Sequence, residues 1–175
     1  MLINLSDVLS EQHKTVDETV CMDMDFIQLK AGKFPIIRKE PVHVTVNHMK
    51  DKELRIHAET KVSVVIPCDR CLADVEQEFD FNFTRMVDLS TTDAELREGF
   101  DESDYIDGYY LDVDKMLYNE ILIGWPTKVL CSEDCKGICN VCGQNLNEGS
   151  CDCEDTGLDP RMSVVRDLFK NFKEM

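Results

Sequence analysis

The sequence reads Val-His-Val-Thr-Val over residues 42–46 and Leu-Arg-Ile-His-Ala over residues 54–58. In both stretches apolar and polar residues alternate with period two, which is typical of a β-strand buried on one face. The residues between them, 47–52, are polar and have the composition of a turn. The two stretches therefore predict a β-hairpin.

The alternation continues in both directions from this hairpin. It runs through residues 62–66 to Pro67, where the chain is expected to reverse, and it returns through the phenylalanines of residues 79–83. Residues 34–87 thus predict a β-meander. The predicted fold class is α+β: an antiparallel β-sheet or open barrel core with a few helices and a small cysteine-rich, zinc-binding C-terminal lobe.

Helix signals appear only in the second half of the chain. Asp112 is a suitable N-cap for a helix over about residues 112–123, which should end near Gly124. Asp159-Pro160 is a typical start for a second, amphipathic helix at the C-terminus. Residues 88–110 are rich in acidic residues and poor in apolar ones, which predicts a loop.

These signals predict two domains. The first covers residues 1–125 and is a mainly β core that includes the acidic loop, about 88–110, and the helix, about 112–123. The second covers residues 126–175 and combines a cysteine-rich zinc knuckle lobe with the C-terminal helix.

The composition restricts the classes of function. The formal net charge is −16, which disfavours general binding to nucleic acids. No apolar run is long enough to cross a membrane, and the first residues lack the features of a secretory signal. The sequence therefore predicts a cytoplasmic protein that does not bind membranes, and no small-molecule substrate is evident.

Eight of the nine cysteines occur in closely spaced pairs. In a reducing compartment such pairs bind metal more readily than they form disulfides, and zinc takes four thiolates at tetrahedral corners. A site filled by four cysteines is closed and serves structure, so we expect one or two structural Zn²⁺ ions. The predicted ligands are Cys68, Cys71, Cys131, Cys135, Cys139, Cys142, Cys151 and Cys153.

The spacing leaves two arrangements of these ligands open. In the first, Cys139 and Cys142 share an ion with Cys151 and Cys153, because Gly143 permits a knuckle turn, and the other four form a second site. In the other, Cys135 joins Cys139 and Cys142. The ninth cysteine, Cys21, lies in an apolar stretch and is expected to be an ordinary buried residue.

A thiol redox sensor or oxidoreductase that uses a Cys-x2-Cys pair is the alternative function. It would require a low thiol pKa near a helix N-terminus, but turns follow Cys68 and Cys139. The four histidines fall on predicted solvent faces or turns, and none adjoins a cysteine as a catalytic base would. No catalytic residue is predicted, and the sequence indicates a protein that is not an enzyme.

One stretch of the acidic chain is locally basic, and it is the candidate nucleic-acid contact. Its exposed charges would bind phosphates and lose affinity as salt is added. The candidate residues are Lys30, Lys33, Arg38, Lys39, Lys50, Lys52 and Arg55.

The cysteine segments Pro67–Leu72 and Leu130–Asn147 closely resemble the YceD family, the large ribosomal RNA subunit accumulation proteins. The likeness continues in Cys151–Cys153, Asp159–Arg161 and Ile3–Ser6, and so extends over essentially the whole chain. The resemblance implies a bacterial, cytoplasmic, non-enzymatic factor in ribosome biogenesis that supports accumulation of the large-subunit ribosomal RNA. Its partner would be ribosomal RNA itself or a basic ribosomal protein.

Overall fold

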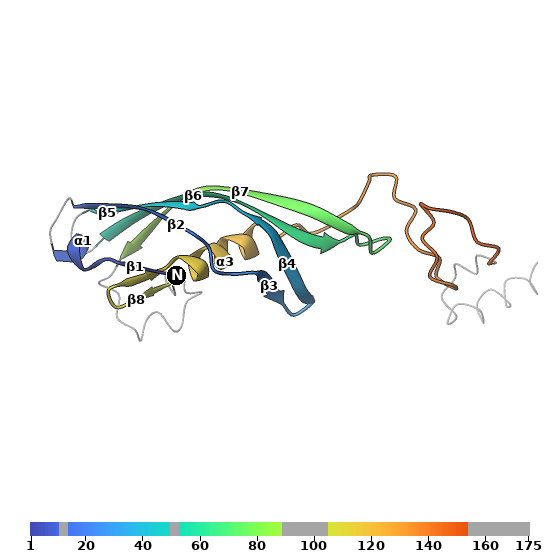
Figure 1. The fold of residues 1–175 in the computed structure, drawn as a ribbon, viewed down its shortest axis with the longest axis horizontal. Helices are drawn as coiled ribbons and strands as arrows, with labels where there is room; N and C mark the ends of the chain where they lie inside the picture. The colour runs from blue at the N-terminus through green and yellow to red at the C-terminus, as the bar shows by residue number, and fades with distance from the viewer. Residues whose placement is uncertain (11–13, 50–52, 89–104, 154–175) are drawn as a thin grey trace, which may run out of the picture. The chain divides into compact units, whose positions relative to one another are not determined.

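The computed structural model describes residues 1–10, 14–49, 53–88 and 105–153. Most of the described strands belong to one sheet, and its strands follow one another in the chain (Figure 1). The strands of this sheet are β2 (Thr15–Val20), β3 (Phe26–Leu29), β4 (Gly32–Lys39), β5 (Val42–His48), β6 (Glu53–Pro67) and β7 (Asp74–Asp88).

The strand register shows that consecutive strands of this sheet can lie end to end beside one longer strand. β5 pairs with residues 54–59 of β6 and β4 with residues 62–64, so that β4 and β5 follow one another along β6. In the same way β2 pairs with β5 and β3 pairs with β4, while β7 pairs with β6. The antiparallel sheet and the hairpin predicted from residues 42–58 are confirmed.

A second, smaller sheet joins distant parts of the chain. It has the order β1-β9-β8, and β1 (Leu2–Asn4) pairs antiparallel with β9 (Tyr110–Asp112), which pairs in turn with β8 (Ile106–Asp107). Two helices are described, the short α1 (Ser6–Ser10) and α3 (Val113–Ile123). The α+β character with few helices therefore holds for the described chain.

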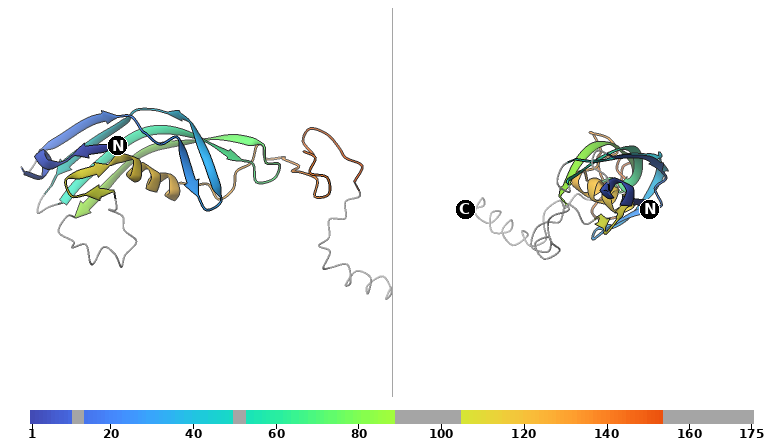
Figure 2. Two further views of the ribbon diagram at one scale, coloured as in Figure 1. Left: turned by 60° about the horizontal axis from the view of Figure 1, so that its bottom comes forward. Right: turned by 90° about the vertical axis from the view of Figure 1, so that its left-hand side faces the viewer.

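Helix α3 provides one side of the hydrophobic core. In the end-on view of Figure 2 the sheet curves around α3. Met116, Leu117 and Ile121 of α3 are fully buried, as are the inward-facing valines of β5 and Leu54 and Ile56 of β6. Burying each such side chain contributes about 1.5–3 kcal/mol.

The ends of α3 are those predicted from the sequence. The Asp112 side chain accepts a hydrogen bond from the backbone N–H of Lys115 at 3.2 Å, which satisfies one of the free donors at the helix start. Gly124 follows the last helical residue and donates its backbone N–H to Glu120 at 2.9 Å. The predicted C-terminal helix lies outside the described residues.

Two predictions from the sequence are wrong in part. The acidic loop expected over residues 88–110 includes β8, the start of β9 and Tyr105, which is buried; residues 89–104 of that loop lie outside the described chain. His48, expected in a polar turn, is instead the last residue of β5 and is buried, with its Nδ1 2.9 Å from the Val8 carbonyl oxygen of α1.

The chain divides into two compact units. The first contains residues Met1–Ile66 and Asp74–Val129, and the second contains the turn Pro67–Ala73 together with the chain from Leu130 onward. Within the described chain, no helix is both long enough and apolar enough to cross a membrane.

Candidate metal centres

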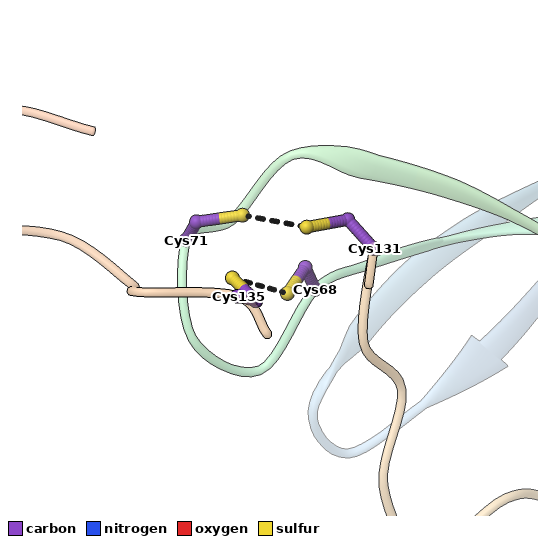
Figure 3. Close-up of side chains that lie close together, drawn as sticks. All are labelled: Cys68, Cys71, Cys131 and Cys135. Atoms are coloured by element: carbon purple, nitrogen blue, oxygen red, sulfur yellow. Dashed lines mark hydrogen bonds between the residues drawn. The ribbon is translucent and has the colours of Figure 1, made fainter. Parts of the chain in front are cut away.

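The second unit holds a group of four cysteines, Cys68, Cys71, Cys131 and Cys135, of which Cys131 is exposed and the other three are buried. Their sulfur atoms all lie within 4.8 Å of one another. Cys71 Sγ is 3.4 Å from Cys131 Sγ, and Cys68 Sγ is 3.8 Å from Cys135 Sγ. Figure 3 shows the four side chains pointing toward one another, two from the turn after β6 and two from the segment that begins at Leu130.

A knuckle turn positions the first two of these sulfurs. Cys68 donates its backbone N–H to Ala73 O at 2.8 Å, and Leu72 donates its own to Cys68 O at 2.9 Å. The N–H of Arg70 is directed at Cys68 Sγ, 3.5 Å away. Leu72 has a φ of +62°, so the turn closes although it has no glycine at this position.

The segment from Cys139 to Gly143 forms the same kind of turn. Gly143 donates its backbone N–H to Cys139 O at 2.9 Å, and the N–H of Val141 is directed at Cys139 Sγ at 3.4 Å. Gly143 has a φ of +75°, at the position that Leu72 occupies in the first turn. Gly143 thus has the role in the knuckle that its place after Cys142 predicts.

This second turn contributes to another group of four cysteines, Cys139, Cys142, Cys151 and Cys153, again with all sulfur atoms within 4.8 Å. Cys142 is exposed, and the other three are partly buried. The two groups correspond to the first of the arrangements that the sequence leaves open. The crossed arrangement, with Cys135 beside Cys139 and Cys142, does not occur.

Two further side chains support the first group, and the spacing of the cysteines gave no sign of either. Arg70 donates from Nη1 to the carbonyl oxygen of Cys135 at 2.8 Å, and its own carbonyl oxygen accepts the N–H of Ile138 at 3.1 Å. Asn147 donates from Nδ2 to Cys135 Sγ at 3.3 Å, and its Oδ1 accepts the N–H of Lys136 at 2.7 Å. Donors directed at sulfur stabilise a thiolate, the form that binds metal.

The distances fit a tetrahedral thiolate site. A zinc ion with four Zn–S bonds of about 2.3 Å has its sulfurs about 3.8 Å apart. The two measured separations, 3.4 and 3.8 Å, are near this value and far from a disulfide bond of about 2.05 Å. Both groups could hold a metal ion, and in the first group these sulfurs already lie near the separation that a tetrahedral site requires.

Three thiols have a lowered pKa, two in the first group and one in the second. Burial raises the pKa of Cys68, but the backbone N–H groups of Cys71, Arg70 and Cys131 outweigh it and lower the pKa to about 6. The N–H groups of Cys142 and Val141 lower the pKa of Cys139 to about 6 as well. Cys135 also has a lowered pKa: burial raises it, but the Asn147 side chain and the N–H of Gly137 outweigh burial.

Two other thiols in each group have raised pKa values. The N–H of Ala73 lowers the pKa of Cys71, but burial and the three neighbouring sulfurs raise it to about 12. Contact with the Cys142 sulfur, followed by burial, raises the pKa of Cys153 to about 12. Cys131 and Cys151 also have raised pKa values: their first interactions, with Cys71 Sγ and the Cys153 N–H, lower the pKa, but other sulfurs and burial prevail.

The remaining cysteine differs from its prediction. Cys21 is exposed and lies just beyond the end of β2, outside both groups. It was expected to be buried because the neighbouring residues are apolar. Cys21 lies between the buried side chains of Val20 and Met22, at an alternate position that faces solvent.

The predicted basic stretch does not form one continuous patch in the described structure. Lys30 and Lys33 lie at the β3–β4 turn, where Lys33 Nζ is 3.4 Å from the centre of the Phe26 ring. Arg55 pairs with Asn47, far along β6 from the residues that pair with β4.

Two of the other basic residues have acidic partners. Lys39 Nζ is 2.9 Å from Asp25 Oδ1 and lowers the pKa of that carboxyl, and Arg38 is 3.9 Å from Glu76. Lys50 and Lys52 lie outside the described residues.

Comparison with known proteins gives the chain its family. The YceD family, described as large ribosomal RNA subunit accumulation protein YceD, matches residues 56–169. That range contains all eight paired cysteines. The family is thus named for the accumulation of a ribosomal RNA and not for a catalytic activity.

Two curated proteins are similar to the chain. One is the chloroplastic large ribosomal RNA subunit accumulation protein YCED homolog 1 of Arabidopsis thaliana, 26% identical over 69% of this chain; the chain spans only 47% of that protein's length. The other is the uncharacterized protein YlbN of Bacillus subtilis (strain 168), 24% identical over 95% of this chain and 94% of its own. No solved structure matches the chain. The family match covers well over half of the sequence, and the chain belongs to the YceD family.

Proposed function

We propose that this protein is a non-catalytic, cytoplasmic factor of ribosome biogenesis that supports accumulation of the large-subunit ribosomal RNA. We also propose that two structural zinc ions hold its cysteine-rich C-terminal lobe. The observation that carries the proposal is the gathering of eight cysteines into two four-sulfur groups, in a family named for this ribosomal RNA.

The donor set supports zinc in a structural role. Four thiolates fill the tetrahedral shell of zinc, so no position remains at which a water or substrate could be activated. The backbone N–H groups of Arg70 and Val141 point at ligand sulfurs, as such knuckles require. Each ion would connect turns and loops that themselves contain little regular secondary structure, and it would supply folding energy that short loops lack.

Charge favours a basic ribosomal protein as the partner. With a net charge of −16 the chain attracts cationic proteins and repels polyanions at long range. Two of the basic residues that were candidates for RNA contact, Arg38 and Lys39, already face carboxylates. Direct contact with ribosomal RNA is the second candidate, and exposed Lys30 and Lys33 at the β3–β4 turn favour it.

The cellular role is tested by removing the protein from its host and measuring the large-subunit ribosomal RNA relative to the small-subunit RNA. A lower ratio that the wild-type gene restores is the expected result. An unchanged ratio during rapid growth would contradict the proposed role.

The zinc proposal is tested on the purified protein. Two zinc ions per chain are expected, with fewer than two rapidly reactive thiols until a chelator is added, because Cys21 is the exposed cysteine outside both groups. Many reactive thiols in metal-saturated protein would favour the alternative, a thiol redox sensor or oxidoreductase. Cys68 and Cys135, the two thiols of the first group with a lowered pKa, are both buried, which opposes that alternative because their sulfurs are inaccessible to a partner disulfide.

The RNA candidate has its own test. Lys33→Glu with Arg38→Glu would weaken binding to a ribosomal RNA fragment if this surface contacts RNA. Lys14→Glu with Lys128→Glu, two charge reversals outside the candidate residues, is the matched control. Equal binding of all three proteins at low salt would exclude the surface.

A further inference from the structure

The outer edge of β7 is a long strand edge that is open in the described structure. β7 has 15 residues and pairs with β6, and it pairs with no other strand in the described part of the chain. An edge strand presents a row of unpaired N–H and C=O groups to which another chain can add. Most strands in proteins have about 3–10 residues, so β7 offers an unusually long edge.

Acidic residues occupy every second position in the first half of this strand. Asp74, Glu76, Glu78 and Asp80 are all exposed. Because side chains at alternate positions point to the same face, these carboxylates form a row with steps of about 6.6 Å. We call these four residues the acidic row.

Nearby basic residues neutralise only part of the acidic row. Lys61 on β6 lies 2.9 Å from Asp80, and Arg38 on β4 lies 3.9 Å from Glu76. Asp74 and Glu78 form no ion pair with a described residue. The row therefore keeps negative charge beside the open edge.

The side chains of β7 at the positions between those of the acidic row, and at the same alternate positions farther along the strand, face the core side of the sheet and are less polar. Val75 and Gln77 are half-buried, and Phe81 and Phe83 are half-buried and pack against the core. A strand added to this edge would place alternate residues over the acidic row and the others beside these side chains. Its best sequence would alternate Lys or Arg with β-branched or aromatic residues.

The same charges decide which partner fits. A second copy of this chain would bring an equally acidic edge, and like charges opposite one another destabilise strand pairing. RNA would be repelled for the same reason. We propose that β7 takes up a basic, extended segment of a partner protein as an added strand. This inference rests on the proposed function for the class of partner, a basic ribosomal protein.

The test uses the full-length, zinc-loaded protein and a fluorescent ten-residue peptide that alternates lysine with valine or threonine. A matched peptide of equal charge carries proline at two of the valine positions, which removes N–H donors and prevents strand pairing. At about 0.15 M salt, where charges beyond about 8 Å are largely screened, we expect the alternating peptide to bind at least tenfold more tightly. Hydrogen exchange should slow at amides of β7 when the peptide is present.

Two variants with a matched control locate the site. Glu76→Lys with Glu78→Lys should weaken peptide binding at least tenfold, and Glu76→Gln with Glu78→Gln, which changes shape little, should weaken it about threefold. Asp17→Lys with Glu18→Lys makes the same charge reversal on β2, an edge strand of the same sheet, and should weaken it less than threefold. Thermal unfolding confirms that each variant is folded.

Three results would overturn the inference. The proline peptide could bind as well as its parent, or the control on β2 could weaken binding as much as the β7 variants; either would show attraction to the overall charge alone. Protection of β7 amides by a ribosomal RNA fragment would assign the edge to RNA. The peptide test does not measure ribosomal RNA levels, so its failure is distinct from failure of the proposed function.

Discussion

A methyl group at Gly137 should weaken the first cysteine group more than the same change at Gly143. Gly137 has a φ of +81°, and a Cβ there would lie 3.1 Å from the backbone oxygen of Arg70. Gly143 has a φ of +75°, but a Cβ there would meet nothing within 4 Å. Alanine at either position adds backbone strain, but only alanine at Gly137 adds crowding, so a comparison of the two variants separates the two effects.

The expected sizes follow from these contacts. A non-glycine residue in the left-handed region costs about 1–2 kcal/mol at either position. At Gly137 the added contact also disturbs the hydrogen bond from Ile138 N–H to Arg70 O, which is 3.1 Å long and contributes about 1 kcal/mol. Gly137→Ala should therefore cost about 2–3 kcal/mol, or about a 30- to 150-fold loss of zinc affinity where folding and binding are coupled.

Zinc affinity at each group is measured by competition with a chromophoric chelator. Gly137→Ala is expected to lower the zinc affinity of the Cys68 group and to leave that of the Cys139 group within threefold of the wild type. Gly143→Ala is expected to lower the zinc affinity of the Cys139 group by a smaller factor and to leave that of the Cys68 group within threefold. Equal losses in the two variants, or a larger loss for Gly143→Ala, would refute the assignment of the contact between Gly137 and Arg70.

Three other outcomes are expected. Cys71→Ser and Cys142→Ser should each reduce the zinc content by one ion per chain, measured by native mass spectrometry, and loss of both ions from either variant would contradict two independent groups. Each group has two thiols whose pKa values are raised above 9.0, and these must lose protons when zinc binds. At the first group, where the pKa values of Cys68 and Cys135 are lowered, zinc affinity should thus rise about a hundredfold per pH unit between pH 7 and 8.5 and fall more steeply below pH 6, where Cys68 is protonated too; a flat profile in a chelator titration would exclude thiol ligands. Asp112→Ala removes the N-cap of α3 and should lower the free energy of unfolding by about 1 kcal/mol in urea, and no change would show that the cap is dispensable.

Local sequence patterns predicted the local parts of the fold. The hairpin of β5 and β6 follows from strict alternation, and the ends of α3 follow from Asp112 and Gly124, because each depends on residues near in sequence. The sheet of β1, β9 and β8 was missed. Its strands have two or three residues, and β1 pairs with a strand more than a hundred residues away.

In the candidate sites, too, features that depend on residues near in sequence were predicted, and contacts between distant residues were not. Spacing alone identified the paired cysteines, but only the fold shows which pairs meet, since Cys71 lies beside Cys131 across 60 residues. The basic stretch was contiguous in sequence, yet β4 and β6 place Arg38 and Arg55 at separate points along the sheet. Arg70 and Asn147 were missed, because a side chain that supports a sulfur from outside the motif has no characteristic spacing.

The discontinuous make-up of the second unit has a consequence for synthesis of the chain on the ribosome. Cys71 emerges 60 residues before Cys131, while Cys142 precedes Cys151 by only nine. By loop length alone, closing the longer span costs about 1.7 kcal/mol more. If each group binds a metal as proposed, Cys68 and Cys71 would form only half of a site during translation, until Cys131 and Cys135 emerge. The second group could close almost as soon as its residues appear, so the order in which the two groups take up metal need not follow the order of the sequence.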